Sequence, residues 1–215
     1  MQKVARLLLA FLGGLGIAIG VTLIVKANVG ADVTSVFFTG IEKHTFMSFQ
    51  FAAYFFTCII LVVLKLIKAD IGVGTVVMAL TTSLAMFATF ILIPDPASLG
   101  LVAQIAYFIS GIVFMGIGVN TGFASGLGNG IYEALSARIS EITGVKDPVV
   151  RTIWEALILT TGILLGGAFG VGTIVFVVTI GFVVTLTNKV IFGYTLRRRV
   201  RLGVTAESVI AKGIS

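Results

Sequence analysis

Charged residues are scarce in this chain, and their scarcity decides its broad class. Only 11% of the 215 residues are Asp, Glu, Lys or Arg, whereas 58% are hydrophobic and the mean hydropathy is +1.14. A soluble domain of this length has too small an interior to bury so much apolar surface. The composition therefore predicts an all-α polytopic membrane protein that lies in a lipid bilayer.

Residues that commonly carry catalysis or bind metals are also few. Cys58 is the only cysteine and lies in an apolar run, so we expect no disulfide framework and no thiolate metal site. His44 is the only histidine and has no carboxylate cluster near it in the sequence. Because no nucleophile–base pair, metal-ligand cluster or cofactor motif is present, we expect neither an enzyme nor a cofactor.

Six apolar segments are long enough to cross a bilayer about 30 Å thick. They cover, approximately, residues 5–25, 47–66, 72–93, 101–122, 149–168 and 173–192. The first follows Lys3 and Arg6, as a signal peptide does, but it is too long and has no small-x-small cleavage site. We therefore predict a retained helix.

One unit occurs twice. Residues 72–81 read GVGTVVMALT and residues 170–179 read GVGTIVFVVT, an offset of 98 residues (170 minus 72) that also matches Gly30 to Gly128. We predict a first repeat at 1–93, a linker at 94–100, a second repeat at 101–192 and a basic cytoplasmic tail at 193–215.

Each repeat contains three predicted spans, so the second copy enters the membrane from the opposite side. Such inverted repeats are typical of secondary transporters.

With the N-terminus and C-terminus in the cytoplasm, all of the 15 lysines and arginines except Lys26 and Lys43 face the cytoplasm. The net charge of +6 thus indicates membrane orientation, and we expect no nucleic-acid partner. Trp154 and Tyr194 fall where an aromatic belt is expected.

Between the first and second span of each repeat lies a shorter amphipathic segment, at 32–43 and 129–142. Gly30 and Gly128 in the preceding turns can adopt positive φ, and Asp32 or Asn129 can cap the helix. Two interpretations remain open. Re-entrant helices would direct their positive N-termini at an anionic or carboxylate-bearing solute, whereas interfacial helices would simply connect the spans.

The GVGT motifs are not phosphate-binding loops, because no lysine follows them and no strand precedes them. Their glycines favour close helix packing, with a hinge or a solute-facing turn as the alternative. The small-xxx-small pairs predict the same close packing at Gly16/Gly20, Gly118/Gly122 and Gly162/Gly166.

Ionisable residues inside a membrane are functional candidates, because burying them in lipid costs about 2.5 kcal/mol or more. Glu155 and Arg151 share one helical face, as a structural pair or as a proton or substrate relay. The full set of candidate substrate-binding residues is Asn28, Gly30, Asp32, Gly72, Gly74, Thr75, Asn120, Gly128, Asn129, Glu133, Arg151, Glu155, Gly170, Gly172 and Thr173.

The order of these features resembles a known bacterial family. The run ANVGAD at residues 27–32, then Arg151 and Glu155, and then GILLGGAFGVGT at residues 162–173 are similar to the YczE/YyaS/YitT-type integral membrane proteins, most closely the YczE-like branch. The resemblance implies a bacterial inner-membrane protein and supplies no substrate.

Three functions fit these features. The first is a small-solute transporter or exporter that works by alternating access of inverted repeats, as a homodimer because six spans are few. The second is a substrate-binding membrane subunit of a larger energised transporter. The third is an accessory or regulatory membrane protein that transports nothing.

Overall fold

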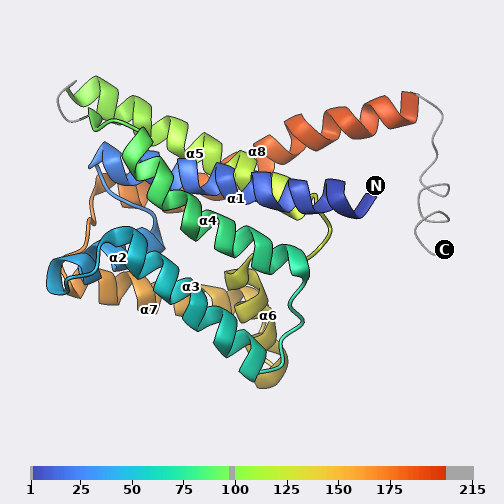
Figure 1. Cartoon of the computed structure of the whole chain (residues 1–215), viewed down its shortest axis with the longest axis horizontal. Coiled ribbons are helices and arrows are strands. Elements are labelled where there is room, and N and C mark those ends of the chain that lie inside the picture. Colours follow the sequence, from blue (N-terminus) through green and yellow to red (C-terminus); the bar gives the residue numbers. More distant parts are fainter. Residues whose placement is uncertain (1, 97–99, 202–215) are drawn as a thin grey trace.

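The computed structural model describes the backbone of residues 2–96 and 100–201, and the side chains of residues 3–96 and 100–190. The predicted basic tail, with Tyr194 and the arginines at 197–199 and 201, lies outside the described side chains. Within the described ranges the regular structure is helical, which confirms the all-α class (Figure 1). The helices are α1 (Gln2–Ala27), α2 (Val33–His44), α3 (Phe49–Leu66), α4 (Val73–Leu92), α5 (Leu101–Phe123), α6 (Ile131–Thr143), α7 (Asp147–Leu164) and α8 (Val171–Arg201).

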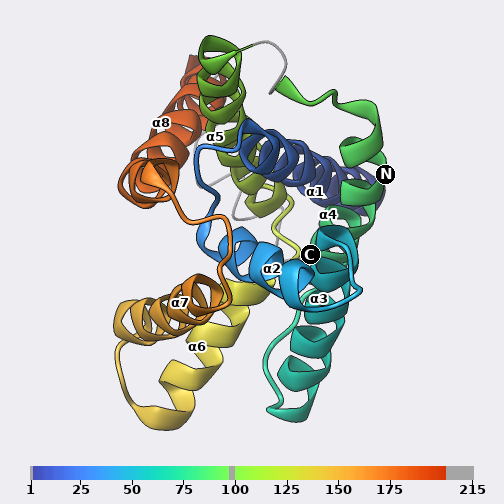
Figure 2. The same ribbon diagram turned by 90° about the vertical axis from the view of Figure 1, so that its left-hand side faces the viewer.

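The helices form two layers. Helices α4, α1, α5 and α8 pack in that order in one layer, and α2, α3, α6 and α7 pack around one another in the other (Figures 1 and 2). Helices α3 and α4 hold the layers together, and Thr57 of α3 shares a 2.8 Å hydrogen bond with Ser83 of α4. Interhelical hydroxyl contacts of this kind are favourable where water is absent.

Glycines allow the backbones of α1 and α5 to pack closely. A Cβ atom built on Gly13 would lie 2.5 Å from the backbone nitrogen of Gly122, and one on Gly20 would lie 2.7 Å from the carbonyl oxygen of Gly111. Only residues without a side chain permit this approach, as the small-xxx-small pattern predicts. The prediction is wrong for Gly166, which has no atom within 4 Å of such a Cβ position.

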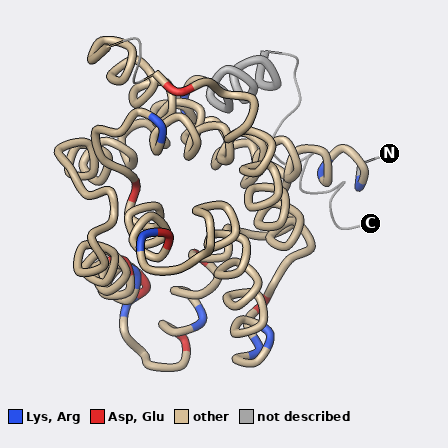
Figure 3. The backbone as a smooth tube through the Cα atoms, turned by 60° about the vertical axis from the view of Figure 1, so that its left-hand side comes forward, with Lys and Arg blue, Asp and Glu red and all other residues tan. Residues whose placement is uncertain are grey.

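Five helices are long and apolar enough to cross a membrane: α1, α3, α4, α5 and α8. Along most of the chain in Figure 3, neither sign of charge appears. The sixth predicted span, 149–168, corresponds to α7, which is not among the five. Helix α7 carries Asp147, Arg151 and Glu155 within 18 residues, and these charges interrupt its apolar character.

The two halves of the chain keep the same helix register. Helices α2, α3 and α4 begin at Val33, Phe49 and Val73. Helices α6, α7 and α8 begin at residues 131, 147 and 171, each 98 residues later (131 minus 33, 147 minus 49, 171 minus 73). The spacing found between the two GVGT motifs thus extends to the boundaries of the helices.

Candidate functional site

Each glycine turn lies against the GVGT motif of the other half of the chain. The backbone N–H of Gly172 donates to the carbonyl of Val29 at 2.8 Å, and the N–H of Gly74 donates to the carbonyl of Leu127 at 3.0 Å. Val29 and Leu127 are 98 residues apart, as are Gly74 and Gly172. The two contacts are therefore reciprocal. We call them the outer junction (residues 28–31 with 170–173) and the inner junction (126–130 with 72–75), names that follow the orientation predicted from the positive charges.

The turn glycines adopt the conformation that the sequence predicts. The φ angles of Gly30 and Gly128 are 132° and 139°, in a region that other residues rarely enter. Close packing adds to the requirement, because a Cβ atom on Gly128 would lie 2.3 Å from the hydroxyl oxygen of Thr75. Neither position tolerates a side chain.

Only one of the two predicted caps forms. Asp32 is the N-cap of α2, and its Oδ2 accepts hydrogen bonds from the Ser35 N–H at 3.2 Å and the Thr34 hydroxyl at 2.7 Å. The prediction for Asn129 is wrong, since Gly130 is the N-cap of α6 and makes no side-chain cap bond. The position equivalent to Asp32 is residue 130, so Asn129 lies one residue too early.

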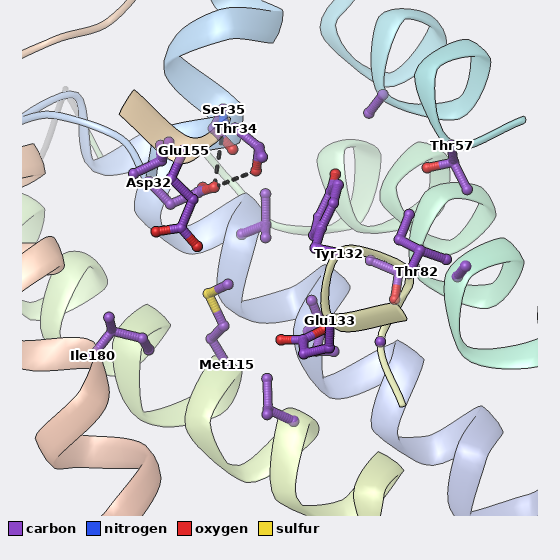
Figure 4. A pocket seen from close by; sticks show the side chains of 18 of the residues that line it. Asp32, Thr34, Ser35, Thr57, Thr82, Met115, Tyr132, Glu133, Glu155 and Ile180 are labelled. Carbon is purple, nitrogen blue, oxygen red and sulfur yellow. Dashed lines mark hydrogen bonds between the residues drawn. The ribbon is translucent and has the colours of Figure 1, made fainter. Parts of the chain in front are cut away.

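A cavity of about 490 Å³ lies between the two layers (Figure 4). The first residues of both short helices line it, together with residues of α1, α3, α4, α7 and α8 and of the C-terminal half of α5. Four of the predicted site residues line it: Asp32, Glu133, Arg151 and Glu155. These are the charged residues of the lining, and they come from three different helices.

Three of the four charged groups form one cluster. The Arg151 Nε donates to the Glu155 carboxylate at 2.8 Å, and an Arg151 guanidinium nitrogen lies 3.4 Å from the Glu133 carboxylate. The side chains are partly exposed, at 47% for Arg151, 37% for Glu155 and 30% for Glu133. The predicted pair on α7 is thus confirmed, and Glu133 of α6 joins it.

Two buried polar atoms of the lining have no hydrogen-bond partner. They are Oδ1 of Asp32 and Nε1 of Trp154, and among the described side chains no other buried nitrogen or oxygen is unpaired. An unpaired buried polar atom costs about 1–3 kcal/mol, so most are satisfied in folded proteins. Asp32 and Trp154, the residues that carry these two atoms, both line the cavity.

An aromatic pair covers one part of the cavity wall. The rings of Tyr132 and Trp154 lie with their centroids 5.2 Å apart. Trp154 thus packs on Tyr132 and lines the cavity, while its place in an aromatic belt stays a prediction. Burial, and then the neighbouring Asp32 carboxylate, raise the pKa of the Tyr132 hydroxyl, so the side chain stays neutral.

The other predicted site residues lie outside the cavity lining. Thr173 is buried and its hydroxyl accepts the N–H of Ala31 at 3.1 Å in the outer junction, and Thr75 packs in the inner junction. The amide of Asn120 donates to the carbonyl of Val184 at 2.8 Å and the hydroxyl of Thr187 at 2.7 Å, which joins α5 to α8. The residues of the two junctions are Asn28, Gly30, Gly72, Gly74, Thr75, Gly128, Asn129, Gly170, Gly172 and Thr173.

The two turns and the two GVGT motifs, which are grouped above as candidate substrate-binding residues, thus form two separate junctions. Sequence reasoning also missed most of the lining. The polar triplet Thr81-Thr82-Ser83 in an otherwise apolar span is the signal that could have found part of it, because polar residues inside a span face protein or a cavity. The additional lining residues that Figure 4 labels are Thr34, Ser35, Thr57, Thr82, Met115, Tyr132 and Ile180.

Comparison with known proteins places the chain among proteins of unknown function. A Haemophilus influenzae protein, described only as uncharacterized, is 29% identical over 189 residues, which cover 88% of this chain and 85% of the relative. No solved structure matches the chain significantly. Residues 4–189 match the family of unknown function DUF6198, and the chain therefore belongs to that family.

Proposed function

We propose that this protein is a small-solute transporter or exporter, and that the cavity between the two layers is its solute site. The observation that carries the proposal is the position of the two unpaired polar atoms. Asp32 Oδ1 and Trp154 Nε1 belong to residues that line the same cavity, and residues from the middle of α4, between Met78 and Met86, line that cavity too. Transporter sites of this kind lie near the bilayer midplane and use helix N-termini and broken backbone.

The proposal includes an inverted repeat. The reciprocal hydrogen bonds of Val29 with Gly172 and of Leu127 with Gly74 support it, because a two-fold relation between the halves exchanges one contact for the other. The common helix register supports it as well. In an inverted repeat the outer and inner junctions are equivalent hinges, and the exchange of their conformations opens the cavity to one side and then to the other.

The inverted repeat requires that α7 crosses the membrane as a sixth span. Its apolar residues Val149, Ile153, Leu157 and Leu164 are 47–81% exposed, and they lie on the opposite face from Arg151 and Glu155. A helix that presents apolar residues outward and charges to a cavity suits a lipid surface.

The neighbours of α7 support the same conclusion. The loop after α7 bonds to the outer junction, where the N–H of Ala31 donates to the Ala168 carbonyl at 3.1 Å. The helix before it, α6, bonds to the loop that precedes α4, where Arg138 Nε donates to the Ile67 carbonyl at 2.8 Å. Helix α4 ends beside Lys26 at the C-terminal end of α1, so these two loops lie at opposite ends of the bundle. Six crossings leave both termini on the cytoplasmic side of a bacterial inner membrane, as the distribution of positive charge predicts.

Ligand-dependent thermal stabilisation of the purified protein tests this function. A solute that binds the native state at 100 times its Kd adds about 2.7 kcal/mol of stability, so the melting temperature rises. We expect one solute class from a metabolite and ion panel to stabilise the wild type, and Asp32→Asn and Glu155→Gln to abolish the shift. Glu141→Gln is the matched control, because Glu141 pairs with Arg138 outside the cavity.

The opposite result is equally informative. If no solute in a broad panel stabilises the protein, and the variants only melt at lower temperature, the result would contradict a solute site. It would favour an accessory protein. We expect a homodimer in the membrane, and cross-linking in native vesicles measures that separately.

A further inference from the structure

We propose that the solute carries a positive charge on an organic body, an inference that rests on the transport function proposed above. The cavity lining contains three carboxylates and one guanidinium, from Asp32, Glu133, Glu155 and Arg151. The chain as a whole has a net charge of +6, so the negative balance is a local property of the cavity. A cavity with low-dielectric walls and one sign of charge concentrates solutes of the opposite sign.

The one positive side chain of the lining is already paired. Arg151 lies 2.8 Å from the Glu155 carboxylate and 3.4 Å from that of Glu133. An anionic solute at Arg151 would have to displace one carboxylate and then face both. The guanidinium therefore orients the two acidic side chains, and it leaves one negative charge in the cluster.

The helix N-termini are also occupied by the protein's own carboxylates. Asp32 caps α2, where its Oδ2 accepts the Ser35 N–H at 3.2 Å. Glu133 lies in the first turn of α6, with a carboxylate oxygen only 2.1 Å from the position of a Cβ atom on Gly130. The positive ends of both short helices are thus neutralised from within. The helix N-termini alone would favour an anionic solute, whereas this arrangement favours a cationic one.

Asp32 supplies an independent observation in favour of a cationic solute. The residue is 3% exposed and lines the cavity, and its Oδ1 has no partner among the described residues (Figure 4). No lysine or arginine within the described side chains forms a salt bridge with it. A carboxylate oxygen that is buried without a partner is relieved by a cation or by a hydrogen-bond donor that binds in the cavity.

The rest of the lining suits an organic cation better than a bare metal ion. The lining includes the aromatic residues Trp154, Tyr132, Phe38 and Phe176, and it also includes Met115. Aromatic rings attract ammonium groups through their quadrupole, most strongly in the case of Trp. A volume of about 490 Å³ also lies in the usual range for small-molecule sites.

Charge-selective thiol labelling tests the charge of the solute before the solute is known. In a Cys58→Ala background, Val119→Cys places one thiol on the α5 wall, and Thr82→Cys places one on the α4 wall as a second variant. The probes are the cationic trimethylammonioethyl, the neutral hydroxyethyl and the anionic sulfonatoethyl methanethiosulfonates. His44→Cys is the exposed control outside the cavity.

We expect the ratio of cationic to anionic labelling rates, normalised to a free thiol, to rise on the order of tenfold inside the cavity. Glu155→Gln is expected to lower that ratio towards the value at His44→Cys. Tetraethylammonium is expected to slow the neutral probe at Val119→Cys, whereas Na⁺ at equal ionic strength is not.

Three results would overturn the inference in distinguishable ways. A ratio at or below that of a free thiol contradicts a cationic solute, while the transport function stands if another solute stabilises the protein. If Na⁺ and tetraethylammonium slow the labelling of Val119→Cys equally, the solute has no organic body, but its positive charge still stands. A cavity thiol that reacts with no probe, while His44→Cys reacts, contradicts a solute site altogether.

Discussion

At the residue scale, the protein places its ionisable side chains where other groups restrain them. Asp32 is held by the N-terminus of α2, and the acids of the cluster are held by Arg151. Charges in an apolar bilayer are expensive unless they are paired or line a polar cavity. In the described structure all four charged residues of the lining have a partner. Only one oxygen of Asp32, Oδ1, has no hydrogen-bond partner.

Asp32 has two roles that substitutions separate. Asp32→Ala removes the cap of α2 and is expected to lower the free energy of unfolding by about 1 kcal/mol. Asp32→Asn keeps an oxygen that accepts the Ser35 N–H, so we expect a melting temperature near that of the wild type with loss of solute stabilisation. A thermal melt of both variants in detergent measures this. Equal melting temperatures for the Ala and Asn variants would show that the cap contributes nothing.

Arg151 is expected to matter more for charge than for stability. Its side chain is 47% exposed, and ion pairs of such exposure contribute about 1 kcal/mol or less. Arg151→Gln is therefore expected to melt close to the wild type, while the cationic-to-anionic labelling ratio at Val119→Cys increases further. A decrease in that ratio would contradict a direct electrostatic effect of Arg151, and would mean that Glu133 and Glu155 leave the cavity or become protonated without the guanidinium that pairs with them.

At the scale of elements, the two junctions show why glycine occurs at both GVGT motifs. A Cβ atom on Gly72 would lie 1.8 Å from the carbonyl oxygen of Leu127, and one on Gly170 would lie 2.7 Å from that of Val29. Both obstacles are backbone atoms, which cannot move aside as a side chain can. Close packing is therefore enough to explain why glycine occurs at these positions. A hinge at the GVGT motifs belongs to the proposed transport mechanism.

Gly72→Ala is expected to destabilise the protein by roughly 1–3 kcal/mol, because the methyl group overpacks a backbone contact. Gly181→Ala in α8 is the matched control, since no atom lies within 4 Å of its Cβ position and alanine favours the helix. Melting temperatures in the same detergent measure the difference. If both variants melted alike, the inner junction would be more open than described.

At the scale of the whole molecule, α7 decides how the two halves relate. Five spans would put the ends of the chain on opposite sides of the membrane, whereas six put them on the same side. The contacts of α6, which precedes α7, and of the loop after α7 lie at opposite ends of the bundle, which supports the crossing.

Single-cysteine labelling from either side of a membrane tests the crossing of α7. In a Cys58→Ala background, we expect a membrane-impermeant maleimide to reach Phe169→Cys from outside intact cells, and to reach Lys146→Cys only after lysis. Phe169 follows α7 and Lys146 precedes it. Labelling of both positions from the same side would contradict six spans and with them the inverted repeat.

The sequence by itself determined the class of the protein, the places of its helices and one turn conformation. Long apolar runs, glycine punctuation and a repeated motif are local signals, and local signals predict where a helix begins and ends. The boundaries expected for the two short helices, 32–43 and 129–142, lie within two residues of α2 and α6. The positive φ angles of Gly30 and Gly128 were likewise predictable, since few other residues adopt them.

Only the tertiary structure decided what the motifs contact and which residues form a site. Val29 of a turn pairs with Gly172 of α8, and Glu133 of α6 approaches Arg151 of α7, and no spacing rule connects the members of either pair. The charge of the cavity followed from that packing, because the same helix N-termini that attract anions are covered here by carboxylates. Local sequence sets the elements, whereas long-range contacts determine the potential inside the cavity that those elements enclose.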